Sequence, residues 1–356
     1  LFLSMILKII FSFAASIIKF FLILFFINSS AHAEKNIKYY PNDHGVISIM
    51  YHRFNENKYP STNIKIDVFE KQLELIEKNN IEYYDPSMFD NEFNNPKKNK
   101  KILITVDDAF TSFYNNAWPI LKKKKIPFIL FVSTEPVGKP GYMNWDQIKE
   151  VSSYDFAFIG NHSHTHEYLL DFSYDEFERD IKNSIKIFEE KLGYNPIFFS
   201  YPFGEYNLKQ TEFIENNFKY GFGQHSGVID LTKNRFELPR FPINEKYGEL
   251  ERFEFILKLF PIAYKNLKPS DKFISKDQNP PTIEIEFFKE QKNIQKINCF
   301  SNEGNEWRNS IMKFEDNILK IDFREKFTFR RGRINCSLND GDIWRWLGIQ
   351  MSIEVN

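Results

Sequence analysis

Two adjacent acidic residues, Asp107 and Asp108, stand where an apolar segment of this chain ends. The segment 102–106 is apolar and partly β-branched, a pattern that predicts a buried strand. Two carboxylates at the end of such a strand repel each other and lose hydration, and a bound cation would offset that cost. A helix-capping turn is the alternative interpretation, because Asp is also common where helices begin.

Three histidines follow a second apolar segment further along the chain. His162 and His166 are four residues apart, a spacing that allows two imidazoles from one turn to bind the same ion. His164 lies between them and would point elsewhere if the turn were helical. Two His and one Asp leave coordination positions open for water and substrate, whereas structural zinc sites favour four ligands rich in Cys. Metal binding is therefore favoured over a polar loop with incidental histidines.

The acidic pair and the three histidines belong to the first two of three sequence blocks. These blocks are TVDDA at 105–109, HSHTH at 162–166 and SYPFG at 200–204. In order and in their setting at strand ends, these blocks resemble the motifs of the NodB-like polysaccharide deacetylases, carbohydrate esterase family four. The resemblance covers roughly residues 45–265. Without the other two blocks, SYPFG would be interpreted as an ordinary Pro-Gly turn.

The resemblance implies a role for each member of the first two blocks. Asp108, His162 and His166 would bind a divalent metal, with Zn²⁺ as the default and Fe²⁺, Co²⁺ or Ni²⁺ also suited to such a site. The metal would polarise the acetamide carbonyl and hold the attacking water. Asp107 would be the general base that takes the proton of that water.

In the third block, the resemblance assigns the backbone N–H of Phe203 to the stabilisation of the tetrahedral oxyanion. Phe in place of the family's Tyr should be tolerated, because this contact comes from the main chain. Tyr201 is expected in the surroundings of the substrate, and Pro202 and Gly204 would shape the loop.

This chain departs from the family motifs at two positions. Many members carry an Arg, which orients the base, where this chain has Ser200. Arg240 in LPRFPI is a candidate substitute, and a surface strand cation is the alternative. Ala109 replaces the Gly that closes the first block, which restricts the backbone.

The family supplies the proton for the leaving amine from a late histidine. His225 is the only histidine after the second block, so it is the candidate for this acid; a hydrogen-bonded loop histidine is the alternative. His52, in a YHR segment of the kind found in envelope deacetylases, is expected to line the pocket or order its rim rather than to act in catalysis.

The start of the chain is typical of a secretory signal peptide. Residues 9–27 are mostly apolar, and Ala31-His32-Ala33 is a small-x-small cleavage box, so we expect cleavage after residue 33 and a periplasmic or secreted protein. A retained membrane anchor is the alternative, since the apolar stretch approaches spanning length. After cleavage no stable membrane span is expected.

Charge and cysteine content exclude some classes of function. Removal of residues 1–33 takes away two lysines and no acid, so the net charge of −1 becomes more negative. Nucleic-acid binding is not expected, because it requires a basic excess. Cys299 and Cys336 are the only cysteines, and in an oxidising compartment a disulfide between them is favoured over two buried free thiols.

Strand and helix patterns alternate from 46 to about 264, which predicts a (β/α) barrel with its chemistry at the C-terminal strand ends. The family resemblance implies the distorted version. Capping boxes at 67–70 and 173–176 are expected to open helices, the second of which stops at Gly193. The expected domains are the signal peptide 1–33, the barrel 34–268, a linker 269–281 and a small antiparallel β domain 282–356.

The sequence therefore predicts a metal-dependent hydrolase that removes the N-acetyl group of N-acetylglucosamine units in an envelope or extracellular polysaccharide. Two alternatives remain. The protein could be a non-catalytic glycan-binding protein on a degenerate barrel, as the missing Arg at Ser200 would allow. It could also be an O-acetyl esterase that acts on polysaccharide.

Overall fold

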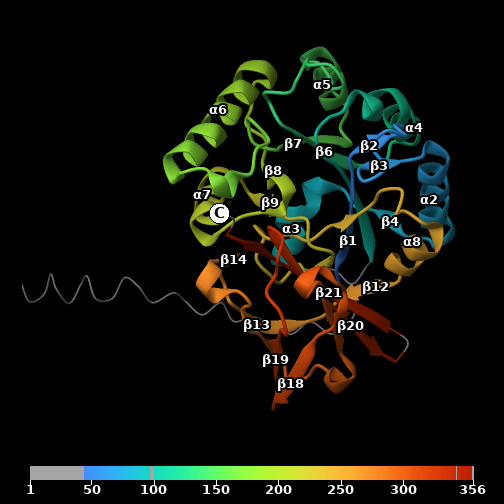
Figure 1. The fold of residues 1–356 in the computed structure, drawn as a ribbon. Coiled ribbons are helices and arrows are strands. Elements are labelled where there is room, and N and C mark those ends of the chain that lie inside the picture. Colours follow the sequence, from blue (N-terminus) through green and yellow to red (C-terminus); the bar gives the residue numbers. More distant parts are fainter. Residues whose placement is uncertain (1–43, 97–99, 342, 355–356) are drawn as a thin grey trace, which may run out of the picture. The chain divides into compact units, whose positions relative to one another are not determined.

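The computed structural model describes residues 44–96, 100–341 and 343–354, which all lie within one compact unit, 39–356 (Figure 1). The predicted signal peptide lies outside the described residues. Within the described part of the chain, no helix combines the length and the hydropathy that crossing a bilayer requires.

A curled sheet with mostly parallel strands forms the centre of the first part of the chain (Figure 1). Its strands lie in the order β10-β1-β5-β6-β7-β8-β9, with β11 beside β1 and β4 beside β5. The bounds are β1 (Val46–Tyr51), β4 (Glu82–Tyr83), β5 (Lys101–Val106), β6 (Phe128–Val132), β7 (Ala157–Asn161), β8 (Phe198–Ser200), β9 (Tyr220–Phe222), β10 (Val228–Ile229) and β11 (Phe241–Pro242). A separate two-stranded sheet pairs β2 (Arg53–Phe54) with β3 (Asn63–Ile64).

The segment 238–243 closes this sheet on itself. Leu238 bridges to Phe222 of β9, and β11 pairs in parallel with β1. One short segment thus pairs with β9 at one end of the strand series and with β1 next to the other end, and Arg240 lies in the middle of this segment. The prediction of a distorted (β/α) barrel is confirmed.

Helices surround the strands on the outside (Figure 1). Their bounds are α2 (Ile66–Lys78), α3 (Phe89–Asn94), α4 (Trp118–Lys124), α5 (Trp145–Ser152), α6 (Tyr174–Leu192), α7 (Leu208–Asn217) and α8 (Leu250–Ile256). The amphipathic pattern of α6 turns buried residues such as Phe177, Ile181 and Phe188 toward the sheet, as a helix of period 3.6 requires.

The two predicted capping boxes have different outcomes. At α6 the box is confirmed, because Ser173 and Glu176 exchange hydrogen bonds and Gly193 ends the helix with a φ of 82°. At α2 the prediction is wrong, because Lys65 is the N-cap residue and no side chain caps the helix. Asp67 lies inside the first turn instead, where a negative charge interacts favourably with the helix dipole.

The C-terminal part of the chain forms two antiparallel-rich sheets. One contains β12 (Leu259–Pro261), β14 (Phe273–Ile274), β16 (Asn298–Ser301), β17 (Arg308–Asn309), β20 (Arg331–Asp340) and β21 (Ile343–Ile353). The other contains β13 (Tyr264–Lys268), β15 (Ile283–Phe287), β18 (Ile311–Glu315) and β19 (Ile318–Asp322). We call these two sheets the C-terminal β region. β14 lies inside the predicted linker 269–281 and pairs with β21. The domain boundaries themselves stay predictions.

A disulfide joins β16 and β20 in the C-terminal β region. Cys299 of β16 and Cys336 of β20 lie directly opposite each other in the antiparallel ladder, and both are fully buried. The expected bridge is therefore present.

Candidate active site

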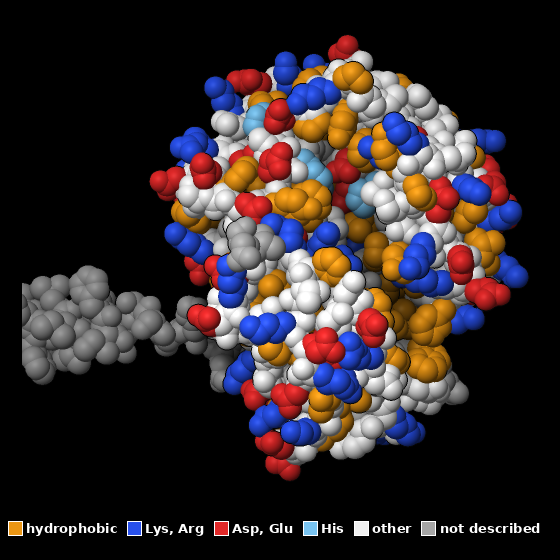
Figure 2. Space-filling model, viewed as in Figure 1, with side chains coloured by type: hydrophobic (Ala, Val, Ile, Leu, Met, Phe, Trp, Pro, Cys, Tyr) orange, Lys and Arg blue, Asp and Glu red, His pale blue; other side chains and the backbone are white. Residues whose placement is uncertain are grey.

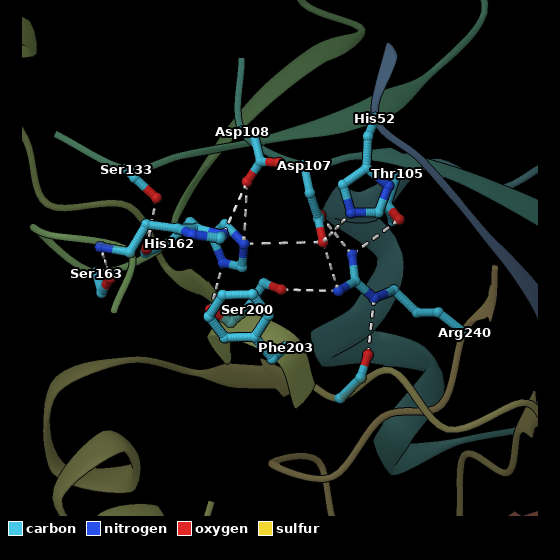
Figure 3. A network of polar contacts seen from close by, with 12 residues as sticks. His52, Thr105, Asp107, Asp108, Ser133, His162, Ser163, Ser200, Phe203 and Arg240 are labelled. Atoms are coloured by element: carbon cyan, nitrogen blue, oxygen red, sulfur yellow. Dashed lines mark hydrogen bonds and ion pairs between the residues drawn. The ribbon is translucent and has the colours of Figure 1, made fainter. Parts of the chain in front are cut away.

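The C-terminal ends of neighbouring parallel strands bring the predicted site residues to one edge of the sheet (Figure 3). Asp107 and Asp108 follow β5, His162 follows β7, and Ser200 ends β8. The backbone N–H of Asp107 still bonds to Tyr51 of β1, and that of His162 to Val132 of β6. Because the hydrogen bonding between strands continues to Asp107 and His162, the backbone of both residues is held in place and their side chains project from fixed positions.

Asp108, His162 and His166 form a cluster of the kind that holds a metal ion. Asp108 Oδ1 lies 3.0 Å from His166 Nε2 and 3.5 Å from His162 Nε2. Atoms that are each bound about 2.1 Å from one ion would be separated by roughly 3.0–3.4 Å at octahedral or tetrahedral angles. His162 Nε2 is buried and has no hydrogen-bond partner among the described residues. The donor set therefore fits a divalent cation.

The surroundings of His162 favour the form that a metal ligand requires. Its Nδ1 lies 2.7 Å from the carbonyl oxygen of Ser200, which accepts a hydrogen bond from an Nδ1–H. That bond leaves the lone pair of Nε2 for an ion. Burial lowers the pKa of His162 to about 4, so the imidazole is neutral at physiological pH.

The segment 162–166 is an irregular loop and not a helical turn. Ser163 and His166 have positive φ values of 68° and 59°, which direct His166 back toward His162. His164 turns away, and its Nδ1 lies 2.8 Å from Thr134 Oγ1. Asp180 of α6 accepts bonds from the backbone N–H groups of His164 and Thr165, so a helix outside the sheet holds the loop in place.

Asp107 lies beside the metal cluster, with its Oδ2 3.9 Å from His162 Nε2, and is bound by Arg240. Two guanidinium nitrogens of Arg240 donate to the two carboxylate oxygens of Asp107, at 2.6 and 2.9 Å. The same guanidinium donates to Ser200 Oγ at 2.8 Å, and its Nε donates to the Gly223 carbonyl. Both partners of this ion pair are fully buried. Burial alone would raise the pKa of Asp107, but Arg240 together with His162 and His52 outweighs that effect, and the pKa lies below its ordinary value.

The two candidate histidines for the proton donor lie in different places. His52 follows β1, and its Nε2 is 4.0 Å from Asp107 Oδ2 (Figure 3). His225 lines a cavity of about 320 Å³ between the barrel and the C-terminal β region, together with residues such as Tyr206 and Lys272. No member of the metal cluster lines that cavity. His52 thus lies close to Asp107, whereas His225 lines a cavity to which the metal cluster does not contribute.

The loop around Phe203 lies against the metal cluster. Phe203 has a φ of 59°, and its ring lies 4.9 Å from that of His166 and stacks on Tyr168 at 4.1 Å. Gly204 has a φ of 69°, and a Cβ there would lie 2.6 Å from Gln224, so this turn requires glycine. Pro202 begins the turn.

Tyr201 faces the interior rather than the site. It is fully buried and packs against Tyr206 and Phe199. On the surface, Figure 2 shows histidine and acidic side chains together in a hollow of the visible face.

Comparison with known proteins agrees with this geometry. The family model described as polysaccharide deacetylase matches residues 94–220. This part of the chain is a polysaccharide deacetylase domain. A poly-β-1,6-N-acetyl-D-glucosamine N-deacetylase of Staphylococcus aureus (strain MSSA476) is 24% identical over 263 residues, 65% of this chain and 87% of that protein.

Two solved structures share the fold of the deacetylase barrel. The Streptococcus pyogenes deacetylase PplD, in complex with acetate, has a TM-score of 0.55 at 23% identity, covering 61% of this chain and 99% of that chain. IcaB from Ammonifex degensii has a TM-score of 0.52 at 21% identity, covering 60% of this chain and 97% of that chain.

Sequence reasoning missed Asp180 as part of the deacetylase site. A signal was present, since Asp180 lies on the face of α6 that also carries the buried Phe177, Ile181 and Ser184. An acid on the buried face of an amphipathic helix needs a hydrogen-bonding partner, and the partner here is the histidine loop.

Proposed function

We propose that this protein is a metal-dependent deacetylase that hydrolyses the N-acetyl group of N-acetylglucosamine units in an envelope or extracellular polysaccharide. The observation that carries the proposal is the separation of two adjacent carboxylates. Asp108 faces His162 and His166, and Asp107 is bound by Arg240 beside them. This division suits one carboxylate for metal binding and the other for proton transfer.

In this proposal the cation is held by Asp108, His162 and His166, with Zn²⁺ as the default. When bound, it would supply Lewis acidity at the acetamide carbonyl and raise the acidity of the attacking water. Asp107 accepts the proton of that water, and its lowered pKa ensures that it is ionised at neutral pH. The backbone N–H of Phe203 stabilises the negative charge that develops on the carbonyl oxygen.

We assign the proton donor for the leaving amine to His52 and no longer to His225. His52 is about 15% exposed and lies 4.0 Å from the proposed base, so it can reach both the site and solvent. Burial lowers the pKa of His225 to about 3, which leaves it neutral and unable to donate as an imidazolium. It also lines a cavity to which no member of the metal cluster contributes.

The substrate class is inferred from the similarity to poly-β-1,6-N-acetyl-D-glucosamine N-deacetylases. A polysaccharide outside the cytoplasm also fits the predicted signal peptide. We therefore place the enzyme in the periplasm or among secreted proteins, acting on an acetylated amino-sugar polymer.

The proposal is tested by acetate release from oligomers of β-1,6-linked N-acetylglucosamine. The protein is stripped with a chelator, and each of Zn²⁺, Fe²⁺, Co²⁺ and Ni²⁺ is then added back separately. We expect acetate only when metal is present, and none from the Asp108→Asn variant. O-acetylated xylan is offered in parallel. Release from xylan alone would identify an O-acetyl esterase, and binding of the oligomers without any release would identify a glycan-binding protein.

A further inference from the structure

Residues 202–205 form the turn that we call the Phe203 loop. The C-terminal β region contacts this loop through a buried glutamine of β21. Gln350 Nε2 donates to the carbonyl oxygens of Gly204 at 2.9 Å and Phe203 at 3.2 Å. Its Oε1 accepts from Arg333 Nε at 3.3 Å. Because an arginine can only donate, this contact fixes the amide so that its NH₂ group faces the loop.

An ion-pair cluster holds the next residue of the same loop. Glu205, which is 1% exposed, contacts Arg330 at 3.1 Å and Arg331 at 3.6 Å. Arg330 also pairs with Asp171 and lies over the ring of Tyr168. Tyr168 in turn stacks on Phe203 (4.1 Å). Residues of β20 and β21 and the segment just before β20 therefore contact the loop through its carbonyls and through Glu205.

The loop needs such support because of its backbone conformation. Phe203 has a φ of 59° and a ψ of 2°, a region that residues with a Cβ rarely adopt unless their surroundings hold them there. A fixed carbonyl at Phe203, together with these two angles, sets the direction of its N–H. That N–H is the proposed oxyanion donor.

We propose that Gln350 is a positioning residue for the deacetylation reaction, and that the C-terminal β region completes the active site by holding the Phe203 loop. This inference rests on the proposed function. Gln350 acts through the backbone of Phe203 and Gly204 and touches no reacting atom. The barrel and the C-terminal β region are thus one catalytic unit.

The test compares Gln350→Met with a matched control, Gln291→Met. Methionine keeps the length of the side chain but cannot donate. Gln291 is also buried, in the connection between β15 and β16, and among the described residues its Nε2 donates to the backbone carbonyl of Lys292. For Gln350→Met we expect kcat to fall about 10- to 100-fold, because a misplaced catalytic group costs rate rather than binding. KM, zinc content and the thermal midpoint should match the control.

Hydrogen exchange provides a readout that needs no activity. The peptide covering residues 201–206 should exchange faster in Gln350→Met than in the wild type, and unchanged in Gln291→Met. If Gln350→Met does not fold, Arg331→Met tests the same loop, since Arg331 Nη1 lies 3.5 Å from the Phe203 carbonyl. That variant should change kcat and exchange in the same direction.

Equal kcat and equal exchange in Gln350→Met and its control would overturn the inference. So would parallel losses of kcat and thermal midpoint in both variants, because these would indicate general loosening. If the wild-type protein releases no acetate, the proposed function fails. Hydrogen exchange then still tests whether Gln350 holds the Phe203 loop: faster exchange only in Gln350→Met supports this structural part of the inference, and equal exchange rejects it.

Discussion

At the residue scale, two neighbouring carboxylates have different partners. Burial would raise the pKa of both carboxyl groups. At Asp107 the guanidinium of Arg240 together with neighbouring histidines outweighs this effect, and at Asp108 the imidazole of His166 together with the other two histidines does. Both pKa values therefore lie below the ordinary value, and both groups are ionised at neutral pH. Asp108 has a φ of 73°, which helps its side chain to point away from that of Asp107. Two adjacent acids can thus perform different tasks.

Replacement of Asp107 by Asn should separate the base from the ligands. We expect acetate release to fall about 10²- to 10⁴-fold, because proton abstraction is lost. Metal content should stay at the wild-type level. The free energy of unfolding should fall by as much as about 3 kcal/mol, since Arg240 loses its buried ionic partner.

Elemental analysis, acetate release and thermal unfolding measure these three effects. Asp277→Asn, at an exposed position, is the control for the substitution itself. Loss of metal together with activity would mean that Asp107 is a ligand, against the proposed division.

The two histidines give a second comparison at this scale. His52→Gln should lower kcat about 10²-fold, because the leaving amine loses its proton donor. His225→Gln should change kcat less than about threefold, since it lies in another cavity. Steady-state kinetics on the same oligomers measures both. A large loss in His225→Gln with a normal His52→Gln would restore the assignment made from sequence.

Sequence alone identified the residues of the metal cluster because their types, spacing and strand-end positions are local features. Sequence also placed His52 at the pocket, but not its distance to Asp107, which depends on the pairing of β1 with β5. His225 was selected by its order in the chain. It lines a cavity together with residues of β21, such as Gly348 and Gln350, which lie far away in sequence.

At the element scale, β7 must lie close to β6 for His162 to reach the site. Gly160 permits this, because a Cβ there would lie 2.3 Å from the ring of Phe131. Gly160→Ala should therefore lower the free energy of unfolding by roughly 1–3 kcal/mol through overpacking. Zinc affinity should fall as well, since β7 positions His162.

Urea unfolding and zinc titration measure these two quantities. Gly138→Ala is the comparison, because a Cβ there meets nothing within 4 Å and only its φ of 84° opposes the change. It should affect stability but not zinc affinity. Unchanged stability in Gly160→Ala would show that the strands separate at little cost.

Element types followed from the sequence more reliably than the details of their ends. The Ser173 box was predicted correctly because a local side-chain pattern is sufficient for it. The box at Asp67 failed because the carbonyl of Lys65 accepts the N–H groups of Val68 and Phe69, so the helix starts earlier. That start depends on the chain that enters from β3, and the hydrophobic pattern of the helix does not contain this information.

At the scale of the whole molecule, long-range contacts complete the site. Arg240 reaches Asp107 only because the segment 238–243 lies between β9 and β1. The bonds from Gln350 to the Phe203 loop span almost 150 positions of sequence. Local patterns predicted the barrel and an antiparallel region after it. These local patterns contained no sign that the antiparallel region supports the Phe203 loop of the barrel.

The disulfide tests how far this support depends on the stability of the C-terminal β region. Cys299 and Cys336 are 37 positions apart, so the Cys299→Ala, Cys336→Ala double variant should lose about 2–4 kcal/mol of unfolding free energy. Urea unfolding followed by tryptophan fluorescence measures the loss.

At 25 °C, acetate release should stay within about twofold of the wild type, because β20 and β21 remain paired along ten residues. Activity should disappear at a lower urea concentration, together with the fluorescence change. If acetate release persists above the urea concentration of the fluorescence change, the barrel and the C-terminal β region act independently.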